Sequence, residues 1–118
     1  MKDISNIHDV RVKNILDKVE KNMIQLFQDK LQDIILYGSY ARNENTFESD
    51  MDIMILVNEK EEILKDYEDR VEDIMVDLSL EYNIVLSLYA QSVQQYKKHV
   101  SVLPFLRNIQ QEGIKVYG

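Results

Sequence analysis

Two aspartates and a glycine–serine pair are the residues of this chain whose types and spacing suit chemistry. Asp50 and Asp52 are two positions apart, so on a β-strand both carboxylates project from the same face. Carboxylates held side by side repel one another, and a divalent cation between them relieves that repulsion. Gly38 permits a sharp turn, and Ser39 is placed to cap a short helix whose free N–H groups suit a phosphate. This set predicts metal-dependent phosphoryl or nucleotidyl transfer.

Two short apolar runs must position these residues. Ile34–Tyr37 and Met51–Val57 are largely aliphatic, and polar turn residues bound each run, which favours strands over helices. The near-continuous apolar character of the second run predicts burial on both of its faces. Between the strands we expect a short helix from Ser39 and a polar loop over residues 43–48.

The spacing of the candidate residues resembles the signature of a known family. Gly38-Ser39, ten further residues and then Asp50-x-Asp52 look like the motif of the minimal nucleotidyltransferases, small members of the DNA polymerase β-like superfamily. The resemblance implies that the Gly-Ser turn contacts the nucleotide triphosphate, with ATP as the substrate. It also implies that both aspartates bind Mg²⁺ or Mn²⁺ and are catalytic. Arg42 stands where the family often has an arginine in its short helix.

Arg42 and its neighbour have more than one interpretation. Arg42 is expected either to contact the nucleotide phosphates or to pair with a nearby acid such as Glu44 or Asp50. Asn43 stands where many members of the family carry glycine. Because asparagine tolerates the left-handed backbone region, this replacement is expected to be mild.

The third predicted strand, residues 83–89, departs from the family pattern. Polymerase β-like sites usually add a third carboxylate there, as a base or as a further metal ligand. The positions that share a face with the site are not acidic here: Asn83, Val85, Ser87 and Tyr89. Glu81 is the nearest acid and Asp77 lies on the preceding helix, and neither is expected within reach of the two aspartates. Activation of a nucleophile is therefore harder to explain than metal and nucleotide binding.

Hydrophobic periodicity supplies the rest of the fold. Residues 1–7 are expected to form a loose start. The other predicted elements are a helix over residues 8–28, a helix from the acidic run 59–62 to 81, a short helix within 90–100, a helix over 103–112 that starts at Pro104 and is stopped by Gly113, and a short edge strand over 114–117. Together they predict an α/β fold: a small mixed β-sheet with flanking helices, the polymerase β-like nucleotidyltransferase core. We expect one domain over residues 1–118.

Composition narrows the classes of function. The net charge is −7 and the lysines and arginines are scattered among acids, so direct binding of nucleic acid is not expected. The absence of cysteine excludes a disulfide framework and a cysteine zinc site, and it fits a reducing cytoplasm. No apolar run approaches the roughly twenty residues that a membrane span needs. His8 and His99 each stand alone near a helix end and are interpreted as surface residues.

Two functions stay open. In the first, the protein is an enzyme that passes AMP from ATP–Mg²⁺ to a protein acceptor, since 118 residues leave no room for an acceptor-binding domain. The family resemblance implies an antitoxin whose partner is a HEPN-domain ribonuclease toxin. In the second, a weak or inactive relative of these enzymes neutralises its partner by contact alone. The missing third acid favours contact, and the intact Gly-Ser and Asp-x-Asp set favours transfer. A free-standing aminoglycoside-modifying enzyme is a third alternative.

Overall fold

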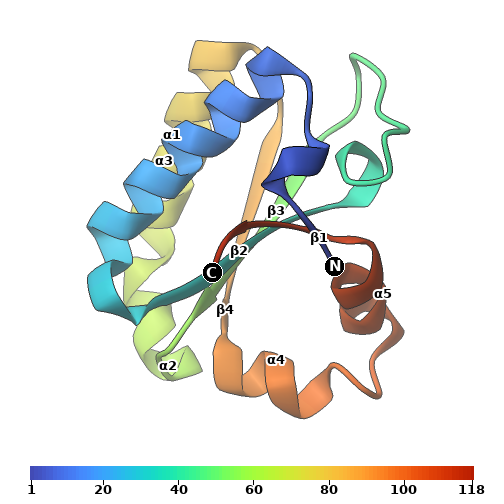
Figure 1. Ribbon diagram of the computed structural model, residues 1–118. Coiled ribbons are helices and arrows are strands. Elements are labelled where there is room, and N and C mark those ends of the chain that lie inside the picture. Colours follow the sequence, from blue (N-terminus) through green and yellow to red (C-terminus); the bar gives the residue numbers. More distant parts are fainter.

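The computed structural model describes residues 1–118 and contains one five-stranded sheet in the order β1-β5-β2-β3-β4 (Figure 1). The pairs β1–β5 and β3–β4 are parallel, whereas β5–β2 and β2–β3 are antiparallel. The strands are β1 (Lys2–Asp3), β2 (Leu31–Tyr37), β3 (Met51–Val57), β4 (Leu86–Ser92) and β5 (Ile114–Tyr117). This is the small mixed sheet that the sequence predicts.

Helices cover both faces of the sheet. They are α1 (Val10–Phe27), α2 (Glu61–Leu64), α3 (Glu68–Tyr82), α4 (Val93–His99) and α5 (Pro104–Glu112), with single 3₁₀ turns at η1 (Ile4–Asn6), η2 (Gln28–Lys30), η3 (Gly38–Tyr40) and η4 (Lys65–Tyr67). Figure 1 shows α1 and α3 side by side in one layer, with α4 and α5 gathered on the other side of the sheet.

The central strand β3 joins two hydrophobic clusters. Ile53 and Ile55 pack with α1 and α3 in the larger cluster. Met54 and Leu56 pack with α4 and α5 in the smaller one. Every residue of β3 except Asp52 is buried, because alternate side chains enter opposite layers. The predicted bounds of this strand and its burial on both faces are confirmed.

The prediction for the third strand is wrong by three residues. β4 runs from Leu86 to Ser92, not from 83 to 89, because α3 continues to Tyr82 and Asn83 ends it in a left-handed conformation with φ 50°. The Arg11 side chain of α1 donates to the carbonyl oxygens of Tyr82 and Asn83, so a distant residue helps to fix this end. The predicted phase is right, since Ser87 and Tyr89 lie on the face of Asp52.

Four other expectations need correction. The helix expected over 59–81 is divided by the 3₁₀ turn at residues 65–67, where the Tyr67 ring packs on Phe27 at 5.0 Å between centroids. The first strand begins at Leu31 because its partner β3 extends the ladder to Val57. Residues 1–7 are not loose: β1 pairs with β5 and the Ile7 side chain is buried. For the same reason β5 is not the expected edge strand, because it lies between β1 and β2.

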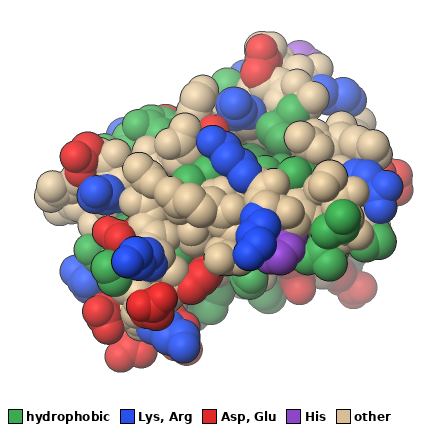
Figure 2. Space-filling model, turned by 90° about the horizontal axis from the view of Figure 1, so that it is seen from below, with side chains coloured by type: hydrophobic (Ala, Val, Ile, Leu, Met, Phe, Trp, Pro, Cys, Tyr) green, Lys and Arg blue, Asp and Glu red, His purple; other side chains and the backbone are tan.

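The remaining helices agree with prediction to within a few residues. α1 begins after Asp9, whose carboxylate accepts hydrogen bonds from the N–H groups of Arg11 and Val12. α5 starts at Pro104 and stops at Gly113, as expected. No helix combines the length and the apolar character that crossing a membrane requires. Acidic and basic side chains are interspersed on the face shown in Figure 2.

Candidate active site

The turn after β2 has the sharp geometry that Gly38 was expected to provide. Gly38 has φ +74°, a region that other residues rarely adopt, and its carbonyl oxygen accepts from the N–H groups of Ala41 and Arg42 at 3.1 and 3.2 Å. The expected capping role of Ser39 is wrong. Tyr37 occupies the capping position of this single 3₁₀ turn, and no side chain caps it. The turn begins one residue before Ser39, which places that side chain inside the turn.

Asp52 lies directly against this turn. The β2–β3 register pairs Tyr37 with Asp52, so the residue after Tyr37 reaches the Asp52 side chain. A Cβ added to Gly38 would lie 2.5 Å from Asp52 Oδ2, much closer than van der Waals contact. Gly38 is therefore required twice, for its backbone conformation and for the space that the carboxylate occupies. This contact joins the two halves of the motif.

The second aspartate adds charge to the same place. Asp50 is exposed and precedes β3, whereas Asp52 is half-buried within the strand. Burial raises the pKa of Asp52 above its ordinary value of 3.8, the charge of Asp50 raises this pKa further, and Arg42 partly offsets the effect. The two carboxylates, which Arg42 compensates only in part, thus form a locally unfavourable arrangement that a cation would relieve.

A cavity of about 270 Å³ opens beside Asp52. It lies between the end of β2, the 3₁₀ turn and α5. Its lining residues are Tyr37, Gly38, Arg42, Asp52, Phe105, Asn108, Ile109 and Glu112. Three of the five predicted site residues therefore meet at one cavity, and Ser39 and Asp50 lie outside its lining.

Helix α5 contributes residues that the sequence analysis missed. Phe105 is 56% exposed and meets the Tyr37 ring edge-on, with 5.8 Å between centroids. Burial, followed by the nearby Asp52 carboxylate, raises the pKa of the Tyr37 hydroxyl. Asn108 and Glu112 add polar groups to the cavity. No local motif marks these residues, because α5 reaches the site only through the folding of the chain over the sheet.

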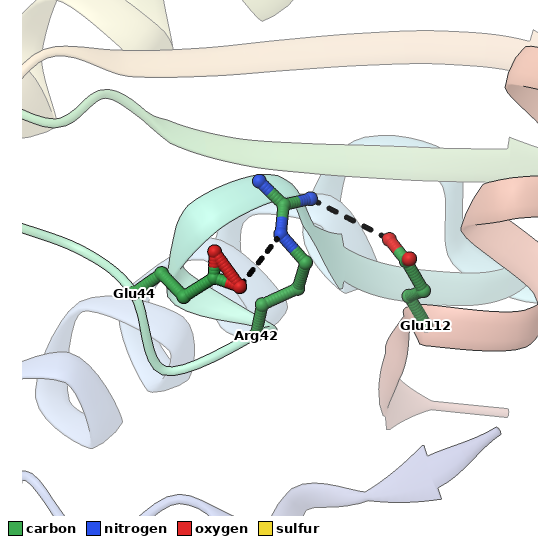
Figure 3. A network of polar contacts seen from close by, with 3 residues as sticks. All are labelled: Arg42, Glu44 and Glu112. Carbon is green, nitrogen blue, oxygen red and sulfur yellow. Dashed lines mark hydrogen bonds and ion pairs between the residues drawn. The ribbon is translucent and has the colours of Figure 1, made fainter.

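Arg42 is held by two acids, one expected and one not. Its Nε lies 3.5 Å from Glu44 Oε1, and its Nη1 lies 3.4 Å from Glu112 Oε2 (Figure 3). The Arg42 side chain is 41% exposed, so both ion pairs are open to solvent and weak. The expected pairing with Glu44 is confirmed, and Glu112 takes the place suggested for Asp50. Arg42 can exchange these carboxylates for phosphate oxygens at a small cost. Next to it, Asn43 adopts the left-handed conformation expected of it, with φ 58°.

The neighbouring strand brings no acid to the pair. The β3–β4 register places Ser87 beside Asp52, and no third aspartate, glutamate or histidine lies close enough to form a metal-binding group. Asn83 is the end of α3 and is not a strand position. Two carboxylates nevertheless fit Mg²⁺, because this ion commonly takes one or two protein carboxylates and completes its shell with phosphate oxygens and water.

Comparison with known proteins identifies the family. Residues 16–116 match the model of the family described as "Nucleotidyltransferase domain". Two proteins of Methanocaldococcus jannaschii, both named putative protein adenylyltransferases, are similar in sequence. The first is 31% identical over 86% of this chain and 95% of its own length. The second is 34% identical over 77% and 83%, respectively.

Solved structures show the same fold. One is a toxin–antitoxin crystal structure with AMP-PNP, with a TM-score of 0.53 and 21% identity over 87% of this chain and 73% of the other. A second contains a tri-AMPylated Shewanella oneidensis HEPN toxin and its MNT antitoxin, with a TM-score of 0.52 and 18% identity over 90% and 71%. These likenesses confirm the expected polymerase β-like fold. With its Gly38–Asp52 contact and the family match over most of its length, this chain belongs to the nucleotidyltransferase domain family.

Proposed function

We propose that this protein is an antitoxin that transfers AMP from ATP to a protein partner, a toxin of the HEPN type. The observation that carries the proposal is the contact between Gly38 and the Asp52 carboxylate beside Asp50. It holds the Gly-Ser turn and the paired acids together in a family of nucleotidyltransferases. The names of the two archaeal relatives favour a protein acceptor and AMP as the transferred group.

The site residues have distinct parts in the proposed reaction. Asp50 and Asp52 would hold Mg²⁺, which when bound neutralises charge on the phosphates. The turn at Gly38 and Ser39 would contact the triphosphate, and Arg42 would leave Glu44 and Glu112 to bind it as well. The acceptor hydroxyl oxygen forms a bond to the α-phosphorus and its proton passes to solvent water. The bond from that phosphorus to the bridging oxygen breaks, and pyrophosphate leaves.

The partner is inferred from charge and from the solved neighbours. A net charge of −7 favours association with a cationic protein and disfavours a polynucleotide acceptor. The two structural neighbours come from toxin–antitoxin complexes, and one of those toxins carries AMP groups. The cavity beside Asp52 is small, at about 270 Å³, which favours an acceptor that is presented from outside the cavity.

A second candidate function is binding without transfer. Ser87 stands beside Asp52 where the superfamily pattern has an acid, so no strand residue is placed to accept the proton of the acceptor hydroxyl. In this alternative the same face of the molecule blocks the toxin while the nucleotide site has no catalytic part.

Labelled ATP tests the reaction type. ATP labelled in the α-phosphate or in the γ-phosphate is mixed with the protein, Mg²⁺ and a HEPN-type toxin from the same genome. The proposal predicts label on the partner from α-labelled ATP only, and none with the Asp50→Asn and Asp52→Asn double variant. Label from γ-labelled ATP would show phosphoryl transfer instead. A stable complex without label would favour binding alone.

A further inference from the structure

One long edge of the sheet lacks the features that usually protect such edges. β4 has a neighbour on one side only, and the opposite edge is formed by the two-residue β1. Proteins commonly protect edge strands with charged residues, proline or bulges. The sequence of β4, Leu-Ser-Leu-Tyr-Ala-Gln-Ser, contains no charge and no proline, and its register against β3 is continuous. This edge is therefore open to pairing with another strand.

The hydrogen bonds show which backbone groups are free. The Val85 carbonyl oxygen accepts from Met51 N–H, so the backbone N–H and C=O groups of odd-numbered residues in this segment point toward β3. The backbone N–H and C=O groups of the even-numbered residues point away from β3. At one end Leu86 N–H donates to Ser79 Oγ at 3.1 Å, and at the other Ser92 N–H donates to Glu61 Oε1 at 2.9 Å.

Between these two capped ends, the outward N–H and C=O groups of Leu88 and Ala90 have no strand to bond.

These free groups border a groove. A cavity of about 420 Å³ lies between β4 and the segment from α2 to α3. Leu88, Tyr89 and Ala90 form its strand side. Leu64, Val71 and Met75 form an apolar surface on the helix side of the groove. Every second side chain of an added strand would point toward this groove, because side chains on a strand alternate between its two faces.

The charges around the groove favour a basic occupant. Glu61, Glu68 and Glu72 line it, and Lys65 is the one cation among its lining residues. A second copy of this chain would bring the same glutamates and a further −7 charge to the contact, which disfavours pairing of β4 with itself. A segment with a lysine or arginine two positions from an apolar residue, so that both side chains share one face, matches the groove in charge and in apolar character.

We propose that the β4 edge binds an extended segment of another protein by β-strand addition, with an apolar side chain in the groove and basic side chains beside Glu68 and Glu72. The backbone groups of Leu88 and Ala90 provide two donors and two acceptors for this segment. The proposal does not rest on AMP transfer, since it uses neither the nucleotide site nor a reaction. Failure of one therefore leaves the other standing.

A synthetic peptide tests the proposal on the full-length protein by NMR. Valine and lysine alternate at every second position, with threonine between them, so that both kinds of side chain lie on the face toward the groove. We expect saturable binding, with slowed exchange of the Leu88 and Ala90 amide hydrogens and little change elsewhere. Added salt should weaken the affinity, because the pairing charges are exposed. A peptide N-methylated at alternate residues keeps its side chains but loses backbone donors, and it should bind at least tenfold more weakly.

Variants separate backbone pairing from charge attraction. Ala90→Pro removes an outward N–H without touching the β3 ladder and should abolish binding. Glu68→Lys with Glu72→Lys should weaken binding at least tenfold, whereas the control Asp73→Lys with Asp77→Lys changes the same charge on α3 outside the groove and should have little effect. Equal binding by the N-methylated peptide, or an equal loss in both charge pairs, would overturn the proposal. Dimerisation through β4 without peptide would also overturn it.

Discussion

Replacing Gly38 with alanine tests whether the turn and the Asp52 carboxylate form one unit. Two separate penalties follow from the structure. At φ +74° an alanine is strained, which costs about 1–2 kcal/mol of the free energy of unfolding. The new Cβ would lie 2.5 Å from Asp52 Oδ2, and this overpacking adds about 1–3 kcal/mol or displaces the carboxylate.

A double-mutant cycle distinguishes the two penalties. In an Asp52→Ala background the carboxylate is gone, and the nearest remaining atom, Asp52 Cβ, lies 3.6 Å away in ordinary contact. Gly38→Ala should then cost only the backbone strain of about 1–2 kcal/mol. Urea unfolding of the four proteins measures the coupling, which we expect to be about 1–3 kcal/mol. If the two changes add to within about 0.5 kcal/mol, the contact does not matter and the reasoning fails.

Three further predictions concern the same site. Because the pKa of folded Asp52 is raised above 3.8, this residue favours folding below that pH and loses its contribution as pH rises through the folded pKa. Without metal, Asp52→Asn should therefore unfold at a higher urea concentration than the wild type at pH 7, and the difference in urea midpoints should vanish near pH 3. Glu112→Gln releases Arg42 from one ion pair and should tighten ATP–Mg²⁺ binding about 2- to 5-fold in calorimetry. Unchanged affinity would show that Arg42 does not reach the phosphates. Ser87→Asp should raise a slow rate of AMP transfer, because Ser87 is in register with Asp52, whereas Asn83→Asp at the end of α3 should not; equal rates in both would contradict the register argument.

The parts of the fold that local pattern determines were predicted well. Met51–Val57 has the bounds expected of it because a strand buried on both faces leaves an uninterrupted apolar run. The Gly-Ser turn and the Asp-x-Asp strand were recognised from sequence, and the register of β2 on β3 brings Gly38 against Asp52. Pro104 and Gly113 marked the ends of the last helix. Proline suits the first turn of a helix, whereas Gly113 is extended and is needed for space, because a Cβ there would lie 2.5 Å from Ile109 O and 2.6 Å from Ile35 Cγ2.

Features that depend on distant contacts were not predictable in this way. Asn83 resembles the polar start of a strand, but it ends a helix to which Arg11 of α1 donates a hydrogen bond. Residues 1–7 were expected to be loose. The pairing of β1 with β5 joins the two ends of the chain, and no local pattern indicates it. Glu112 has no signature of its own and becomes part of the candidate site only where α5 packs beside the turn.

The mass of the partner protein tests the central proposal most directly. The protein and a HEPN-type toxin from the same genome are co-expressed, purified together and measured by intact-mass spectrometry, beside the Asp50→Asn and Asp52→Asn double variant. AMP transfer predicts a partner heavier by whole AMP units with the wild type and unmodified with the double variant. A partner that is bound but unmodified in both samples would contradict transfer, and two proteins that neither bind nor react would contradict the antitoxin role as well.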